Sequence, residues 1–246
     1  MISAVIPAFN EEPVLESTTR ALATVLARLS PEAWEVILVD DGSTDATGDV
    51  IRRLTREPGI HATRHPANRG KGAAVRTGVL LTRGDAVLVC DADGSTPPDT
   101  LEAFMTALHG GADIVIGDRW GPGAVLDRPQ PRLRRFLGSG YGVLARTLSG
   151  VRTNDYNCGF KLFRGEVARG LLGDCLSERW TWDVEVLTLG ARRGFAITSV
   201  PVRWSQGPRS TVRPLRDVRH SLQDLVSLGL RLGLHRSEPA GRHMPR

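Results

Sequence analysis

Residues 87–99 read "VLVCDADGSTPPD", an apolar run that ends in two aspartates and a turn rich in Gly, Ser, Thr and Pro. A short apolar run bounded by turn residues is typical of a buried strand. Asp91 and Asp93 follow it two residues apart, so both carboxylates can face one ligand once the chain leaves the strand. Taken alone, the pair fits a divalent metal site, a helix cap or a solvated polar loop. The rest of the sequence decides among these three.

The same pattern recurs along the first half of the chain. Further runs rich in Val and Ile occupy 3–9, 35–41 and 112–119, and helical patterns lie between the runs at 12–29, 44–56, 71–82 and 97–109. Nearly continuous apolar strands that alternate with helices predict an α/β fold with a mostly parallel central sheet, covered on both faces. Ligands of such sheets bind beyond the carboxyl ends of the strands. The acidic clusters of this sequence follow such ends.

The second half of the chain does not continue the regular alternation of strands and helices. A loop rich in Gly and Pro at 121–131 is a candidate flap over a site. We expect helices at 132–149 and 214–233, strands at 157–163 and 194–204, and a disordered tail at 234–246. Residues 1–233 are therefore predicted to form a single domain.

Composition narrows the class of protein. The 246 residues are 41% hydrophobic and 24% charged, with a net charge of +5, which is ordinary for a folded domain. Excess arginine in the second half points to an anionic partner: nucleic acid, a phosphorylated substrate or a membrane surface. Three cysteines without CxxC spacing favour a reducing cytoplasm over a disulfide framework or a zinc site. The sequence shows no signal peptide and no apolar run of the roughly 20 residues that span a bilayer.

Three stretches carry polar chemistry. "VDDGSTD" (39–45) ends a strand with carboxylates that suit a uracil N–H, a ribose hydroxyl or a helix cap. "NRGKGAAVRTG" (68–78) places Lys71 among glycines that allow a ligand to approach the backbone, but it lacks the spacing of a P-loop. The hard oxygens of Asp91 and Asp93 suit Mg²⁺ or Mn²⁺, ions that also bind substrate phosphates.

These stretches together resemble a known family. "VIPAFNEE", "VDDGSTD", "NRGKGAAVRTG", "DADGST" and "VIGDR" occur in the order found in the inverting family 2 glycosyltransferases of the GT-A fold. "DYNCGFKLFRGEVA" and "RWTWDVEVL" are similar to the dolichyl- or polyprenyl-phosphate glucosyltransferase branch. The resemblance covers about 2–210. It implies a Rossmann-like, three-layer GT-A fold with a nucleotide-sugar-binding half at 1–119 and an acceptor-binding half at 120–233.

The resemblance also implies which residues bind the donor, a nucleotide diphosphate sugar. Asp41 would contact the uracil, and Lys71 would lie beside the diphosphate. Asp91 and Asp93 would hold a Mg²⁺ or Mn²⁺ ion on the diphosphate, which gives Asp93 a part in catalysis. The predicted donor-binding set is Pro7, Ala8, Asn10, Glu11, Asp41, Lys71, Asp91, Ala92 and Asp93.

The acceptor is implied less directly. Asp183 is predicted to be catalytic, as a general base or a contact to a sugar hydroxyl; the alternative is a carboxylate stabilised at a helix N-terminus. A hydroxyl acceptor needs a base within hydrogen-bond reach, whereas a phosphate monoester is already ionised. Guanidinium groups match phosphate oxygens well. The predicted acceptor-binding set is Arg119, Arg134, Arg135, Arg209 and Glu185.

The leading prediction is metal-dependent, inverting transfer of a hexose, glucose from UDP-glucose, to a polyprenyl or dolichyl phosphate. Members of this branch often carry membrane helices, and this sequence shows none. A transferase of the same fold that acts on a soluble small molecule is therefore one alternative, and a non-catalytic nucleotide-sugar-binding module is another. Nucleic acid is not an expected partner, because the sequence lacks the basic and aromatic interleaving of single-strand binders. We expect a cytoplasmic protein with peripheral contact at the inner face of the cell membrane.

Overall fold

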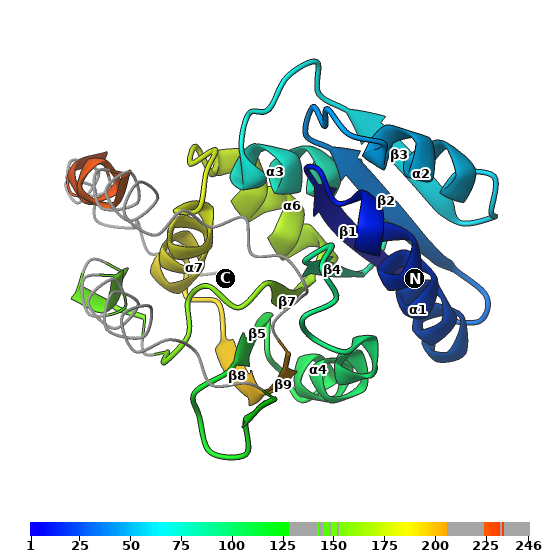
Figure 1. The fold of residues 1–246 in the computed structure, drawn as a ribbon. Helices are drawn as coiled ribbons and strands as arrows, with labels where there is room; N and C mark the ends of the chain where they lie inside the picture. Colours follow the sequence, from blue (N-terminus) through cyan, green and yellow to red (C-terminus); the bar gives the residue numbers. More distant parts are fainter. Residues whose placement is uncertain are drawn as a thin grey trace, which may run out of the picture.

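The computed structural model describes residues 1–127, 142, 145–147, 149–151, 153–205, 224–231 and 233. Their fold centres on a seven-stranded sheet with the order β3-β2-β1-β4-β7-β5-β8 (Figure 1). Its strands are β1 (Ile2–Ala8), β2 (Trp34–Asp40), β3 (Ile60–Arg64), β4 (Ala86–Cys90), β5 (Ile114–Asp118), β7 (Phe160–Arg164) and β8 (Ile197–Pro201). A separate small sheet pairs β6 (Val125–Leu126) with β9 (Arg203–Trp204). The α/β prediction with a mostly parallel sheet is confirmed.

Helices cover both faces of the sheet, which gives three layers (Figure 1). One face carries α1 (Glu12–Leu29), α2 (Thr47–Leu54) and α4 (Leu101–His109), and the other carries α3 (Lys71–Leu81), α6 (Gly165–Asp174) and α7 (Trp182–Arg192). Successive side chains of a strand point to opposite faces. Ile6 of β1 accordingly packs in the core with α1, whereas Val5 packs in the core with α3.

The first helix shows why the chain folds this way locally. Pro13 lies in the first turn of α1, where the N–H that proline lacks would have no helical partner. Leu15, Leu22 and Leu26 are fully buried and form one stripe along the helix. The helix spans the predicted residues, 12–29.

The direction of β7 brings the second half of the chain to the functional edge. β7 runs antiparallel to both β4 and β5, so its amino end lies at the carboxyl end of β4. Cys90 faces Phe160 in this register, and the amide of Asp91 donates to the carbonyl of Gly159 at 3.1 Å. The residues just before β7 therefore lie directly beside the "DAD" turn.

Some elements differ from the sequence prediction. β3 was missed because it is a largely exposed strand without an apolar run, and β6 and α6 were not predicted. α7 was expected only as the alternative for Asp183, a helix N-terminus, and Asp183 does lie in its first turn. The strand expected over 194–204 is interrupted at Val202, and its two parts belong to different sheets. β6 lies inside the predicted flap, where it pairs with β9.

Other expectations fall partly outside the described residues. Of the helices predicted at 132–149 and 214–233, residues 145–147 and 224–231 are helical, and most of the rest is not described. The predicted tail at 234–246 also lies outside the described residues, so the single-domain boundary stays a prediction. Within the described part of the chain, no helix is long and apolar enough to cross a membrane.

Candidate functional site

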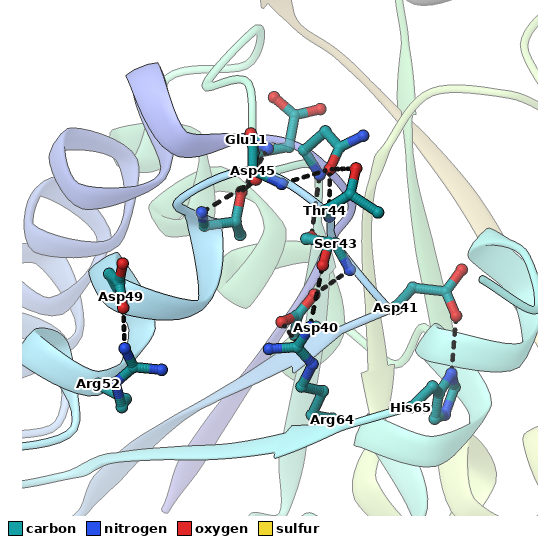
Figure 2. A network of polar contacts seen from close by, with 12 residues as sticks. Glu11, Asp40, Asp41, Ser43, Thr44, Asp45, Asp49, Arg52, Arg64 and His65 are labelled. Atoms are coloured by element: carbon teal, nitrogen blue, oxygen red, sulfur yellow. Dashed lines mark hydrogen bonds and ion pairs between the residues drawn. The ribbon is translucent and has the colours of Figure 1, made fainter. Parts of the chain in front are cut away.

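The loops that follow β1 and β2 are tied together at the carboxyl edge of the sheet (Figure 2). The side-chain oxygen of Asn10 accepts from the amide of Thr44 at 2.9 Å, and the amide of Asn10 donates to Ser43 Oγ at 3.0 Å. Asn10 has a φ of 58°, a left-handed conformation that asparagine adopts more readily than most residues. The amide of Glu11 donates to Thr47 Oγ1 at 2.8 Å. The two loops therefore form one fixed rim of the site.

Asp41 lies buried below this rim and binds protein groups. His65 Nδ1 lies 2.7 Å from Asp41 Oδ1 (Figure 2). The amides of Arg69 and Gly70 donate to the same carboxylate at 3.0 and 2.8 Å. Asp41 therefore fixes the loop that leads into α3, and the uracil contact implied by the resemblance stays a prediction.

Gly42 allows this loop to pass close to its neighbour. Its φ is +74°, and a Cβ there would lie 2.5 Å from the carbonyl carbon of Ala67. A side chain at this position would collide with backbone that cannot yield. The glycine of "VDDGSTD" therefore sets the distance between the β2 loop and the segment that carries Lys71.

Asp91 and Lys71 meet at the centre of the carboxyl edge. Lys71 is the first residue of α3, and its Nζ lies 2.5 Å from Asp91 Oδ1. The Asp91 side chain is 34% exposed, so it remains open to a ligand. Gly159 lies against the other oxygen of Asp91, since a Cβ there would lie 1.9 Å from Oδ2. Asp93 accepts from the amide of Ser95 at 2.9 Å.

Several carboxylates of the described residues crowd together around Asp91. Burial and the charges of Asp93 and Asp91 raise the pKa of Glu11 to about 7. Burial and Asp91 also raise the pKa of Asp93. Burial lowers the pKa of Lys71, but the charges of Asp91 and Asp183 outweigh that effect and raise it. Mutually repelling carboxylates with raised pKa values are a frequent sign of a functional site.

This charge pattern fits a divalent cation whose coordination would be completed by waters and by the substrate. Among the residues that the structure describes, no group of three or more His, Cys, Asp and Glu side chains is arranged to hold a metal ion. Mg²⁺ is usually bound by one or two carboxylates together with waters and substrate phosphates. Asp91 and Asp93 supply that number of carboxylates, and the crowding around Glu11 gives them a surplus of negative charge.

The other predicted donor residues lie at the ends of β1 and β4. Pro7 and Ala8 end β1 beside Val39 and Asp40 of β2. Ala92 is buried between the two aspartates of the "DAD" turn. Ala8 and Ala92 are at most 4% exposed, so their donor-binding roles stay predictions.

Asp183 lies in the first turn of α7 and is buried with Lys161 of β7. The carboxylate and the ammonium form an ion pair, and both side chains are at most 2% exposed. Burial raises the pKa of Asp183, while the charges of Lys161 and Lys71 act against that effect. Sequence reasoning missed Lys161. Its signal was a single charge inside the apolar strand "GFKLF".

A loop before α7 covers the start of α3. The amide of Ala73 donates to the carbonyl of Glu178 at 3.0 Å. Trp180 places its ring centroid 5.3 Å from Lys71 Nζ, within the range of a cation–π contact. The Trp180 residue is 43% exposed, which leaves an aromatic surface beside Lys71 that sequence reasoning also missed.

The predicted acceptor residues divide into two groups. Arg119 forks onto Asp155, with its Nε 2.5 Å from Oδ2 and an Nη 2.7 Å from Oδ1. Glu185 accepts from the amide of Ser177 at 2.7 Å and lies 3.4 Å from Arg231. Both side chains thus bind protein groups, and their acceptor roles stay predictions. The remaining members, Arg134, Arg135 and Arg209, lie outside the described residues.

The fold and the residues at the carboxyl edge of the sheet agree with the family and the relatives that the sequence is similar to. Residues 3–172 match the family described as glycosyl transferase family 2. The chain belongs to glycosyl transferase family 2. It is 34% identical to the dolichyl-phosphate beta-glucosyltransferase ALG5C of Trichomonas vaginalis, over 92% of this chain and 70% of that protein. The human dolichyl-phosphate beta-glucosyltransferase is 31% identical, over 94% of this chain and 75% of that protein. The family 2 chain is thus a hexosyltransferase.

Solved structures confirm the GT-A fold of this family 2 chain. Glucosyl-3-phosphoglycerate synthase from Mycobacterium tuberculosis superimposes with a TM-score of 0.68 and 22% identity, covering 93% of this chain and 79% of that one. A mannosyltransferase from Pyrobaculum calidifontis, solved with GDP-mannose and Mn²⁺, has a TM-score of 0.65 and 20% identity, covering 96% and 65%. At these identities the likeness concerns the fold alone.

Proposed function

We propose that this glycosyltransferase moves glucose from UDP-glucose to a polyprenyl phosphate, with inversion and with a Mg²⁺ or Mn²⁺ ion. The observation that carries the donor half is the crowding of Glu11, Asp91 and Asp93 beside Lys71 at the carboxyl edge. The names of the two relatives described above support glucose as the sugar and a lipid phosphate as the acceptor.

The donor half of the reaction follows from these charges. A bound divalent ion would neutralise the charge that develops on the departing diphosphate. Asp91 and Asp93 would hold the ion. Lys71 would stay beside the diphosphate as a second positive charge, in a position fixed by the first turn of α3.

The acceptor half needs little proton chemistry. A phosphate monoester has a second pKa near 6 and so carries its attacking charge at neutral pH. Its oxygen would attack the anomeric carbon from the face opposite the diphosphate. The new C–O bond forms as the bond to the diphosphate breaks. Asp183, whose Oδ1 already pairs with Lys161, is not required as a base in this scheme.

A transfer assay with three acceptors tests the proposal. Radiolabelled UDP-glucose would be mixed with vesicles that contain a polyprenyl phosphate, with vesicles that contain the matching alcohol, and with a soluble phosphate monoester. We expect radiolabelled glucose to be transferred to the polyprenyl phosphate and to neither of the other two acceptors. We also expect transfer to be lost when EDTA removes the metal. Transfer to the soluble acceptor alone would overturn the lipid assignment. Transfer from a GDP or TDP sugar but not from UDP-glucose would overturn the donor assignment.

A sedimentation experiment tests the proposed contact with the membrane. Because the proposed acceptor is a lipid, we propose that the protein binds peripherally at the inner face of the cell membrane. Sedimentation of the protein with acceptor-containing vesicles, compared with vesicles that lack the acceptor, measures that contact directly. Equal recovery in both pellets would mean that the acceptor does not recruit the protein.

A further inference from the structure

Lys161 is a lysine in the middle of a buried strand. Only 1% of its side chain is exposed, and its strand neighbours Phe160 and Leu162 belong to the apolar core. Its ammonium pairs with the carboxylate of Asp183 and donates to the carbonyl of Cys158 at 2.6 Å. It also lies 5.3 Å from the ring centroid of Trp182. Within the described chain, Lys161 therefore makes its polar contacts with protein groups around the functional edge.

Stability alone is a poor reason for this arrangement. Removing an ammonium and a carboxylate from water is expensive, and apolar residues of similar volume often give an equal or more stable core. Phe163, two residues along the same strand and on the same face, packs in the apolar core. The contacts of the Lys161 ammonium therefore point to a role beyond stability.

Through its ion pair with Asp183, Lys161 is connected to Lys71. Asp183, which Lys161 binds, is next to Trp182, and Trp182 packs against the start of α3: a Cβ on Gly72, the neighbour of Lys71, would lie 2.8 Å from Trp182 Cβ. Asp183 is also one of the two anions whose charges most strongly raise the pKa of Lys71. The other is Asp91, 2.5 Å from Lys71 Nζ. The four groups thus alternate in sign, from Asp91 through Lys71 and Asp183 to Lys161. Without Lys161, the buried Asp183 would tend to take up a proton, and its attraction for Lys71 would weaken.

Through its hydrogen bond to the backbone before β7, Lys161 is also connected to Asp91. The carbonyl that accepts from Lys161 belongs to Cys158, the residue just before Gly159. Gly159 accepts from the Asp91 amide at 3.1 Å and lies against the Asp91 carboxylate. One ammonium therefore holds the supports of both members of the Asp91–Lys71 pair.

We propose that Lys161 is a positioning residue of the donor site, which acts mainly through Asp183 to hold Lys71 beside the diphosphate. It touches no substrate itself. This role rests on the proposed function, because it needs a nucleotide diphosphate bound at the Asp91 edge.

A double-mutant cycle tests this role. Lys161→Met, Asp183→Asn and the double variant would be titrated with UDP and Mn²⁺ by calorimetry, and their unfolding would be followed in urea. We expect each single variant to bind UDP about tenfold more weakly, and the double variant to bind it about tenfold rather than about a hundredfold more weakly. We expect the double variant to be more stable than Lys161→Met, because it leaves no unpaired buried charge.

Two results would overturn the positioning role. One is a folded Lys161→Met protein with the UDP affinity of the wild type. The other is a double variant whose loss of affinity is the product of the two single losses. If Lys161→Met alone fails to fold, Lys161→Gln takes its place in the cycle, and a folded Lys161→Gln protein with the UDP affinity of the wild type overturns the role. A wild-type protein that binds none of UDP, GDP and TDP with Mn²⁺ would instead overturn the proposed function, and this role with it.

A matched control separates positioning from general destabilisation. Glu35 is also a buried charge, with a 1% exposed side chain paired to Arg83 at the amino end of β2. Glu35→Gln should lower the stability and leave the affinity for UDP unchanged. If Glu35→Gln weakened UDP binding as much as Lys161→Met does, loss of stability alone would explain both effects, and the positioning role would be wrong.

Discussion

The two ends of the central sheet both hold carboxylates but surround them in opposite ways. At the amino end, Glu35 accepts from Ser3 Oγ at 2.6 Å and from the amide of Arg83 at 2.8 Å. Burial alone would raise the pKa of Glu35, but the hydrogen bonds with Ser3 and Arg83 outweigh burial and lower it. At the carboxyl end, burial together with Asp93 and Asp91 raises the pKa of Glu11 to about 7.

This difference separates an end whose carboxylate is paired with protein donors from the end proposed to bind the nucleotide sugar. Each oxygen of the Glu35 carboxylate has donors, so the charged form is the stable form in the folded protein. Around Glu11, among the residues that the structure describes, Asp93, Asp91 and Asp45 raise its pKa and the ammonium of Lys71 lowers it. Such crowding costs folding free energy and leaves charge available for a cationic ligand. The following predictions test this contrast, in order of decreasing effect.

Asp91→Asn should cause the largest change. It removes the carboxylate that faces Lys71. If Asp91 holds the ion as proposed, transfer should fall by about a hundredfold or more, because the ion on the departing diphosphate would lose a ligand. The free energy of unfolding should change by no more than about 1 kcal/mol, because the lost pairing with Lys71 is offset by relief of repulsion. Initial rates of transfer and urea unfolding measure the two effects.

Asp99→Asn is the matched control for that variant. Asp99 is an aspartate of the same turn region with a 76% exposed side chain, paired with Arg28 at 2.8 Å. Its substitution should leave transfer unchanged, since exposed ion pairs contribute little. A similar loss of transfer in both variants would mean that charge at this edge acts nonspecifically.

Glu35→Gln should have the next largest effect, and only on stability. Loss of the charged acceptor should lower the free energy of unfolding by about 2 kcal/mol at pH 7. Because the folded pKa of Glu35 lies below its ordinary value of 4.5, its contribution is present above pH 4.5 and is lost as the pH falls through the folded pKa. The difference between variant and wild type should therefore shrink in acid. Urea unfolding at pH 7 and below pH 4 would show a constant difference if this explanation is wrong.

The sequence predicted the sheet and the functional edge for a clear physical reason. Buried parallel strands produce long apolar runs, and polar residues that follow those runs must meet at one edge. Asp91, Asp41 and Lys71 do lie at that edge. The motifs added the family, but they carried no information on which side chains bind protein groups instead of ligands.

The parts that sequence reasoning missed depend on contacts distant in sequence. An apolar run does not specify strand direction, so the antiparallel insertion of β7 between β4 and β5 was not predictable from its residues. That insertion is what places Lys161 against Asp183. Arg119 likewise finds Asp155, 36 residues away, within a loop region without periodicity. The importance of these partners follows from tertiary packing, which no local pattern encodes.

Lys71→Met should change the affinity for a cation about tenfold in the absence of nucleotide. Lys71 Nζ lies 2.5 Å from Oδ1 of Asp91, one of the two carboxylates proposed to hold the ion. Two cations a few ångströms apart repel each other by a few kcal/mol at an effective dielectric constant of about 20. We therefore expect Lys71→Met to bind Mn²⁺ more tightly, measured by electron paramagnetic resonance at pH 8.5, and to bind UDP more weakly.

Arg69→Met is the control for this variant. Arg69 precedes α3, is exposed and pairs with Glu178 at 2.6 Å. Its removal takes away one positive charge near the same helix without freeing Asp91, so Mn²⁺ affinity should change little. Weaker Mn²⁺ binding by Lys71→Met would show that Lys71 supports the cation site instead of competing for it.

Glu11→Gln should give the smallest effect, and its sign is opposite to that of Glu35→Gln. The folded pKa of Glu11 is about 7 and its ordinary value is 4.5, so between these values the folded protein binds more protons than the unfolded chain. Stability therefore falls as the pH rises through this range, and the full penalty is present above pH 7. Glu11→Gln should be more stable than wild type at pH 8 by on the order of 1 kcal/mol, after allowance for solvent screening. The gain should vanish toward pH 4.5, and Mn²⁺ should reduce it at pH 8 by neutralising the same cluster. Urea unfolding across this pH range decides the matter, because a gain independent of pH would mean that Glu11 is not crowded by charge.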